Sequence, residues 1–122
     1  MPREKLKILV VDDEPLIVEV FREMLGQKYE VHTAHSAVEV QGALEERTYD
    51  VLITDWSMPG LNGLSLARRM GAAGRCWVML ITGADEDAIL GVANEGFSVH
   101  RKPIRWRALL DELKAVEERV FR

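Results

Sequence analysis

The stretch KILVVDDEP, residues 7–15, places two adjacent carboxylates directly after a run of aliphatic residues. An uninterrupted run such as Ile8–Val11 is typical of a strand that is buried on both faces of a parallel sheet. Pro15 is a residue that helices favour in their first turn. Asp12 and Asp13 repel each other, so they either lie in a solvated turn, where they can cap the helix, or hold a positive charge. The stretch therefore predicts a buried strand, an acidic turn and a helix.

The remainder of the chain continues this alternation of strand and helix. Strand patterns occupy Lys7–Val11, Glu30–Ala34, Asp50–Thr54, Trp77–Thr82 and Ser98–Arg101. Helical spacing follows each of them, from Pro15 to Gly26, Ala37 to Glu46, Gly63 to Gly71 and Asp85 to Gly96, and after Pro103 to the C-terminus. Strict alternation indicates a parallel five-stranded sheet with helices on both faces, which is a single three-layer α/β domain.

Residue spacing also assigns an apolar face to two of the helices. In the first helix, the residues expected on one side are Leu16, Val20, Met24 and Leu25. In the last helix, they are Leu109, Leu113, Val116 and Val120. The last helix is therefore expected to be an ordinary amphipathic cover helix, with a docking or dimer face as the alternative.

Length and composition restrict the classes of protein that fit. At 122 residues, 48% of them hydrophobic, the chain is long enough for one globular domain and too short for two. Its net charge of −4 argues against binding to nucleic acid through phosphate neutralisation. No apolar run approaches the roughly 20 residues that span a bilayer, and the N-terminus lacks the features of a signal peptide. The single cysteine, Cys76, fits a reducing compartment, so we expect a cytoplasmic protein that binds neither membrane nor nucleic acid.

Polar side chains stand where the predicted strands end. Asp12 and Asp13 follow the first strand, Asp55 follows the third, Thr82 ends the fourth and Lys102 follows the fifth. In open parallel sheets, binding groups gather at the C-terminal ends of the strands, near the point where the winding reverses. If the first and third strands are neighbours, the three carboxylates converge, and their repulsion favours a bound cation. Mg²⁺ suits a site with few carboxylates, several waters and a phosphate.

With these residues, the chain resembles the receiver domain of two-component response regulators, the CheY-like superfamily, over about residues 5–120. The likeness lies in the pair Asp12-Asp13, the motif DWSMPGLNG that begins at Asp55, Thr82 in LITGA, and Lys102 followed by Pro103. It implies a flavodoxin-like (βα)5 sandwich with strand order 2-1-3-4-5, formed by a single receiver domain over residues 1–122.

The resemblance also implies a role for each residue of the site. Asp55 would be the phosphoacceptor, a nucleophile that becomes an aspartyl phosphate. Lys102 would pair with one phosphoryl oxygen, and the Thr82 hydroxyl would donate to another. The Lys102–Pro103 peptide bond is expected to be cis, as in family members. Mg²⁺ would be held by Asp12, Asp13, Asp55 and the backbone carbonyl of Ser57.

One position departs from the family pattern. Family members often carry Tyr or Phe three residues before the lysine, where the rotamer of the ring reports phosphorylation. This chain has Val99 there. Alternation along the strand places Val99 and Arg101 on one face and His100 on the other, together with Lys102. The residues therefore predict an intact site without the usual readout.

The resulting hypothesis is a phosphorelay receiver rather than an enzyme with a separate substrate. It would take a phosphoryl group from a sensor histidine kinase or a histidine phosphotransfer protein and signal to an effector protein or output domain, with a homodimer as one available form. The alternatives are a Mg²⁺-dependent phosphohydrolase with an aspartyl-phosphate intermediate, a flavodoxin-like mononucleotide binder, and a scaffold receiver that is not phosphorylated. The DDEP turn lacks the DxDx[TV] nucleophile loop of such hydrolases and the Ser/Thr/Gly phosphate loop of mononucleotide binders.

Overall fold

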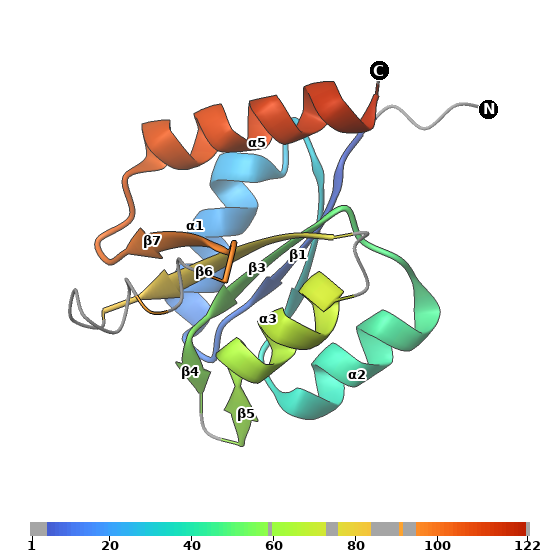
Figure 1. Ribbon diagram of the computed structural model, residues 1–122, viewed down its shortest axis with the longest axis vertical. Helices are drawn as coiled ribbons and strands as arrows, with labels where there is room; N and C mark the ends of the chain where they lie inside the picture. The colour runs from blue at the N-terminus through green and yellow to red at the C-terminus, as the bar shows by residue number, and fades with distance from the viewer. Residues whose placement is uncertain (1–4, 59, 73–75, 84–90, 92–94, 122) are drawn as a thin grey trace.

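Five parallel strands form the central sheet, in the order β2-β1-β3-β6-β7, as seen in a computed structural model of the protein (Figure 1). Their bounds are β1 (Lys7–Val11), β2 (Glu30–Ala34), β3 (Val51–Asp55), β6 (Trp77–Thr82) and β7 (Ser98–Arg101). The structure describes residues 5–58, 60–72, 76–83, 91 and 95–121. Counted along the main sheet, this order is the predicted 2-1-3-4-5, so the doubly wound α/β fold is confirmed.

Helices cover both faces of the sheet (Figure 1). Those described are α1 (Pro15–Leu25), α2 (Ala37–Glu46), α3 (Gly63–Ala72) and α5 (Trp106–Val120). Helices α1 and α5 pack on one face, and α2 and α3 pack on the other. The helix predicted from Asp85 to Gly96 falls mostly outside the described residues. Among the described helices, none combines the length and the apolar character that crossing a membrane requires.

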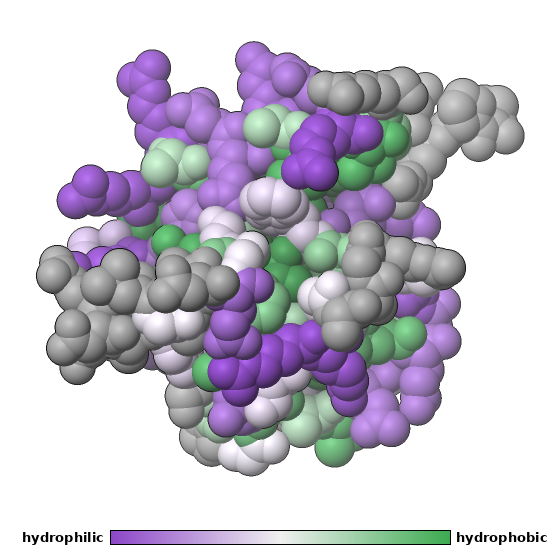
Figure 2. All heavy atoms as spheres, viewed as in Figure 1, coloured by the Kyte–Doolittle hydropathy of each residue, from purple (hydrophilic) through white to green (hydrophobic). Residues whose placement is uncertain are grey.

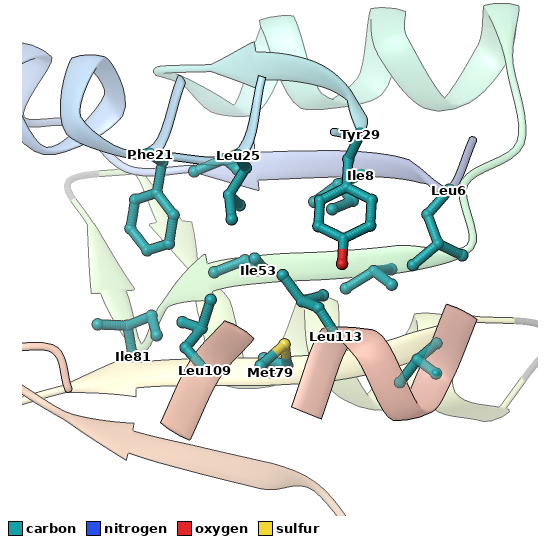
Figure 3. Close-up of a cluster of buried hydrophobic side chains, with 13 residues drawn as sticks. Leu6, Ile8, Phe21, Leu25, Tyr29, Ile53, Met79, Ile81, Leu109 and Leu113 are labelled. Atoms are coloured by element: carbon teal, nitrogen blue, oxygen red, sulfur yellow. The ribbon is translucent and has the colours of Figure 1, made fainter. Parts of the chain in front are cut away.

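Alternation along the strands divides the core into two layers. Ile8 and Val10 of β1 belong to the cluster under α1 and α5, whereas Leu9 and Val11 belong to the cluster under α2 and α3. Figure 3 shows the first cluster, in which side chains of the strands and of both helices point toward one another. The ring of Phe21 meets Trp106 edge to face, with centroids 4.9 Å apart. This contact joins α1 to α5.

The predicted apolar face of α1 was mostly wrong. The residues that α1 buries are Val18, Phe21 and Leu25, of which only Leu25 was predicted. The other three predicted residues, here named the α1 stripe, are exposed: Leu16 (80%), Val20 (40%) and Met24 (43%). The buried residues and the α1 stripe both fit a helical repeat. The ring of Phe21, which is larger than any side chain of the stripe, occupies the core. An apolar stripe therefore lies on the surface of α1.

Helix α5 follows its prediction more closely. Leu109, Leu113 and Val116 are buried, whereas Val120 is 38% exposed near the C-terminal end. Hydrophilic side chains project from the outer side of the helix, at the top of Figure 2. The main body of α5 is therefore an amphipathic cover helix, as expected.

A short hairpin, which the sequence patterns did not predict, follows β3. Strands β4 (Ser57–Met58) and β5 (Leu61–Asn62) pair antiparallel. The Asn62 side-chain oxygen then accepts hydrogen bonds from the backbone N–H groups of Leu64 and Ser65, at 2.9 and 3.1 Å, which caps α3. The hairpin therefore carries the chain from Asp55 directly to the start of α3.

Candidate functional site

Three carboxylates meet at the C-terminal edge of the sheet. Asp12 and Asp13 follow β1, and Asp55 is the last residue of β3. The two strands are neighbours in parallel register, with Val11 opposite Thr54. One oxygen from each carboxylate lies within 4.8 Å of the others. The structure thus brings together the three residues that the sequence analysis placed in one metal site.

The carboxylates differ in their exposure to solvent. Asp12 is 2% exposed, Asp55 is partly buried and Asp13 is exposed. Burial raises the pKa of Asp12, the hydrogen bond from the Glu14 N–H to Asp12 Oδ1 (2.9 Å) lowers it in part, and the charge of Asp55 raises it further. The net effect is a raised pKa. A positive charge bound between Asp12 and Asp55 would relieve this cost.

Helix capping does not explain the acidic turn. The residue at the N-cap of α1 is Glu14, and its side chain makes no capping hydrogen bond. Asp12 accepts from the Glu14 N–H, which lies outside the helix. The described contacts therefore leave the cation site as the better explanation of Asp12 and Asp13.

A lysine ammonium already faces the cluster. Lys102 Nζ lies 3.2 Å from Asp55 Oδ2 and 3.9 Å from Asp12 Oδ2. Partial burial lowers the pKa of Lys102, but the charges of Asp55 and Asp12 and the hydrogen bond to Asp55 outweigh it, so the pKa is raised. The Lys102–Pro103 peptide bond is cis, as predicted. The ammonium is therefore positive at the ordinary pH of a cell.

Thr82 lies at the same edge, between the strands of Asp55 and Lys102. It ends β6, is 2% exposed and directly follows Ile81, which is opposite Asp55 in the register. Its carbonyl accepts a hydrogen bond from the Lys102 N–H over 2.8 Å. The predicted residues Asp12, Asp13, Asp55, Thr82 and Lys102 thus share one end of the sheet. The direction of the Ser57 carbonyl is not among the described contacts, so its role stays a prediction.

Gly63 approaches the backbone of Asp55 more closely than any other residue type could. A Cβ at Gly63 would stand 1.8 Å from the Asp55 carbonyl oxygen and 2.8 Å from that of Trp56. The hairpin and the first turn of α3 thus pack directly against the peptide that carries Asp55. The Asn62-Gly63 pair is a sequence signal that marks this turn.

Comparisons with known proteins agree with this geometry. The profile of the response regulator receiver domain family matches residues 8–114. The transcriptional regulatory protein BtsR of Escherichia coli K12 is 33% identical over 102 residues, which cover 81% of this chain and 43% of that regulator. The transcriptional regulatory protein AruR of Pseudomonas aeruginosa is 30% identical over 122 residues, covering 93% of this chain and 50% of that regulator. The crystal structure of a response regulator receiver domain protein from Clostridium thermocellum superimposes with a TM-score of 0.82 at 32% identity, covering 93% of this chain and 95% of that one.

The fold, the five residues at the strand ends and these likenesses define one class of protein. The chain belongs to the response regulator receiver domain family and is a receiver of two-component phosphorelay signalling. It spans about half the length of the regulators BtsR and AruR.

Proposed function

We propose that Asp55 accepts the phosphoryl group of the relay. The observation that supports this most is the position of its carboxylate, with Asp12 and Asp13 on one side and Lys102 Nζ at 3.2 Å on the other. An Asp55 oxygen would bond to phosphorus while the bond from phosphorus to the imidazole nitrogen of the donor breaks, and the imidazole leaves. Phosphoryl transfer depends mainly on such positioning and on neutralisation of charge.

The donor set fits Mg²⁺. Hard cations of this kind take oxygen ligands, usually one or two carboxylates with several waters. Asp12, Asp13, Asp55 and the backbone carbonyl of Ser57 would hold the ion. Bound there, it would neutralise charge on the transferred phosphoryl oxygens. The raised pKa of the buried Asp12 supports this assignment, because the pKa stays raised although the Lys102 ammonium at 3.9 Å lowers it, so a second cation would relieve the remaining cost of burial.

Two further side chains would act on the phosphoryl group. Lys102 would exchange its contact with Asp55 Oδ2 for a phosphoryl oxygen, as a compact point charge suited to phosphate. Thr82, buried at the end of the neighbouring strand, would donate its hydroxyl hydrogen to a second oxygen. Both would hold the product on the protein rather than on a separate substrate, which is why we assign signalling and not enzymatic turnover.

The proposed donor is a sensor histidine kinase or a histidine phosphotransfer protein in the cytoplasm. The α1 stripe supports a protein donor, because Leu16 is 80% exposed and lies just three residues after Asp13. A protein that covered the stripe would lie next to the acidic turn that holds Asp12 and Asp13. The recipient of the signal would be an effector protein or an output domain, and residues 1–122 would act as a single receiver domain, as a monomer or a homodimer.

Intact-protein mass spectrometry after incubation with acetyl phosphate tests the proposal. We expect one added phosphoryl group that is labile to hydroxylamine, that requires Mg²⁺ and that is absent from Asp55→Asn. Asp111→Asn, a change of the same chemistry at an exposed position of α5, should behave as wild type. An adduct that survives in Asp55→Asn contradicts the assignment of the acceptor. Absence of both an adduct and beryllofluoride binding by calorimetry in wild type would contradict the phosphoacceptor function itself.

A further inference from the structure

A polar cluster away from the carboxylate site joins α5 to two strands. Glu112, in the middle of α5, accepts at both carboxylate oxygens: Trp77 Nε1 donates to Oε2 over 2.6 Å, and Ser98 Oγ donates to Oε1 over 2.7 Å. His100 Nε2 lies 3.0 Å from the same Oε1. The Arg119 guanidinium lies over the ring of Trp77 at 5.5 Å. One carboxylate therefore connects α5 with the start of β6 and with β7.

The Glu112 carboxylate remains ionised in this half-buried position. The side chains of Glu112 and His100 are 23% and 12% exposed. Burial raises the pKa of Glu112, but the hydrogen bonds from His100, Ser98 and Trp77 outweigh it and leave the pKa below its ordinary value. Hydrogen bonds to an ionised carboxylate are roughly twice as strong as those between neutral groups. Glu112 thus anchors β7 more firmly than an uncharged acceptor would.

Strand β7 is the strand that leads to Lys102. It is last in the sheet order, so within the described sheet it pairs with β6 alone. Its residues Ser98 and His100 are opposite Met79 and Ile81, and the Lys102 N–H continues the ladder to the Thr82 carbonyl. An edge strand held by one neighbour depends on its helix contacts to fix its lateral position.

His100 and Lys102 are two residues apart, so their side chains point to the same face of the strand. A displacement of β7 relative to α5 that lengthened the contact between His100 and Glu112 would also move Lys102 Nζ relative to Asp55. Reacting groups must be held within about 0.5 Å of the productive geometry, and a misplacement of about 1 Å can cost on the order of a hundredfold in rate.

We infer that Glu112 is a positioning residue for phosphoryl transfer, because its bonds to Ser98 and His100 fix the strand from which Lys102 reaches Asp55. The inference rests on the role proposed above for Lys102. Glu112 touches neither the carboxylates nor Lys102 in the described contacts, so its effect passes through the backbone of β7.

The test follows the Lys102 ammonium directly, by NMR titration of its Nζ, in wild type, Glu112→Ala and Glu112→Gln. In Glu112→Ala we expect the pKa of Lys102 to fall toward its ordinary value, since Nζ withdraws from Asp55. The rate of phosphorylation by acetyl phosphate should fall on the order of tenfold for a shift of about half an ångström. Glu112→Gln, which keeps a neutral acceptor oxygen for only one of the two donors Trp77 and Ser98, should show a smaller change. Glu118→Ala, at an exposed position of the same helix, is the control and should match wild type.

Two results would overturn the inference. The first is a folded Glu112→Ala protein whose Lys102 titration is unchanged. The second applies if Glu112→Ala does not fold, in which case His100→Gln, which removes one contact of the cluster, takes its place. The inference is overturned if His100→Gln leaves both the Lys102 titration and the rate of phosphorylation as in wild type. Failure of the proposed function would look different, because wild type itself would take no phosphoryl group while the Lys102 titration still responded to Glu112.

Discussion

Replacement of Gly63 by alanine tests how closely the hairpin positions the phosphoacceptor. The added Cβ would stand 1.8 Å from the Asp55 carbonyl oxygen, whereas ordinary van der Waals contact begins at 3.4 Å. The two backbone segments must therefore separate by about 1.6 Å. The segment of Asp55 is held by the pairing of β3 with β6, and the segment of Gly63 is held by the Asn62 cap of α3. Neither segment can therefore move without loss of contacts.

The magnitudes follow from this separation. Overpacking of a tight contact costs about 1–3 kcal/mol of unfolding free energy. A displacement of Asp55 by 1 Å or more should lower the rate of phosphorylation by roughly a hundredfold. The measurements are the midpoint of thermal unfolding and the rate at which acetyl phosphate adds one phosphoryl mass in the presence of Mg²⁺.

Gly42 provides the matched control. It lies inside α2, and a Cβ there meets no atom within 4 Å. Gly42→Ala should leave the rate unchanged and raise stability by about 0.4–1 kcal/mol, as alanine does in a helix interior. A Gly63→Ala protein with a rate within threefold of wild type and an unchanged unfolding midpoint would refute the reasoning.

Three further predictions concern the metal, pH and the cysteine. Mg²⁺ at a hundred times its dissociation constant should stabilise the fold by about 2.7 kcal/mol, measured by thermal unfolding. Asp13→Asn should reduce this gain, and an unchanged gain would contradict Asp13 as a ligand. The pKa of Glu112 is lower in the folded protein than its ordinary 4.5, so its stabilisation is complete above pH 4.5 and is lost as the pH falls through the folded value. Glu112→Gln should therefore lower the melting temperature at pH 7 and lower it progressively less as the pH falls below 4.5, and a loss that does not change with pH would contradict this. Burial raises the pKa of the Cys76 thiol to about 12, so iodoacetamide at pH 8 should label it much more slowly in native buffer than in denaturant, and rapid labelling in native buffer would contradict this.

The sequence predicted most of the sheet because buried parallel strands leave an uninterrupted aliphatic signal. Four of the five strands have the predicted bounds. The exception, β3, begins one residue later, after Asp50, whose side chain accepts from the Lys7 N–H over 2.8 Å. Asp55 then joins the strand, opposite Ile81. The site residues were found because each one ends or follows a strand, where topology alone places them together.

Other features depend on contacts that no local pattern encodes. On α1, the choice between the stripe through Val20 and the face through Phe21 was decided by Trp106, which is far away in the chain. The partners of Glu112 lie 12 to 35 residues from it, in two strands, and none of these residue types is unusual by itself. The position of Val99 gives no hint of this cluster either, since Val99 packs on the other face of the sheet.

The three tryptophans lie in three separate regions of the molecule. Trp56 directly follows Asp55, Trp77 donates to Glu112, and Trp106 packs against Phe21 between α5 and α1. Replacement of Trp56 or Trp106 by phenylalanine, one at a time and with Trp77 kept because it donates to Glu112, would therefore assign part of the intrinsic fluorescence to each region. Stopped-flow mixing with beryllofluoride would then time the response of the carboxylate site, of the contacts around Glu112 and of the α1–α5 contact separately. The order of the three signals would trace the route by which an event at Asp55 reaches the outer helices.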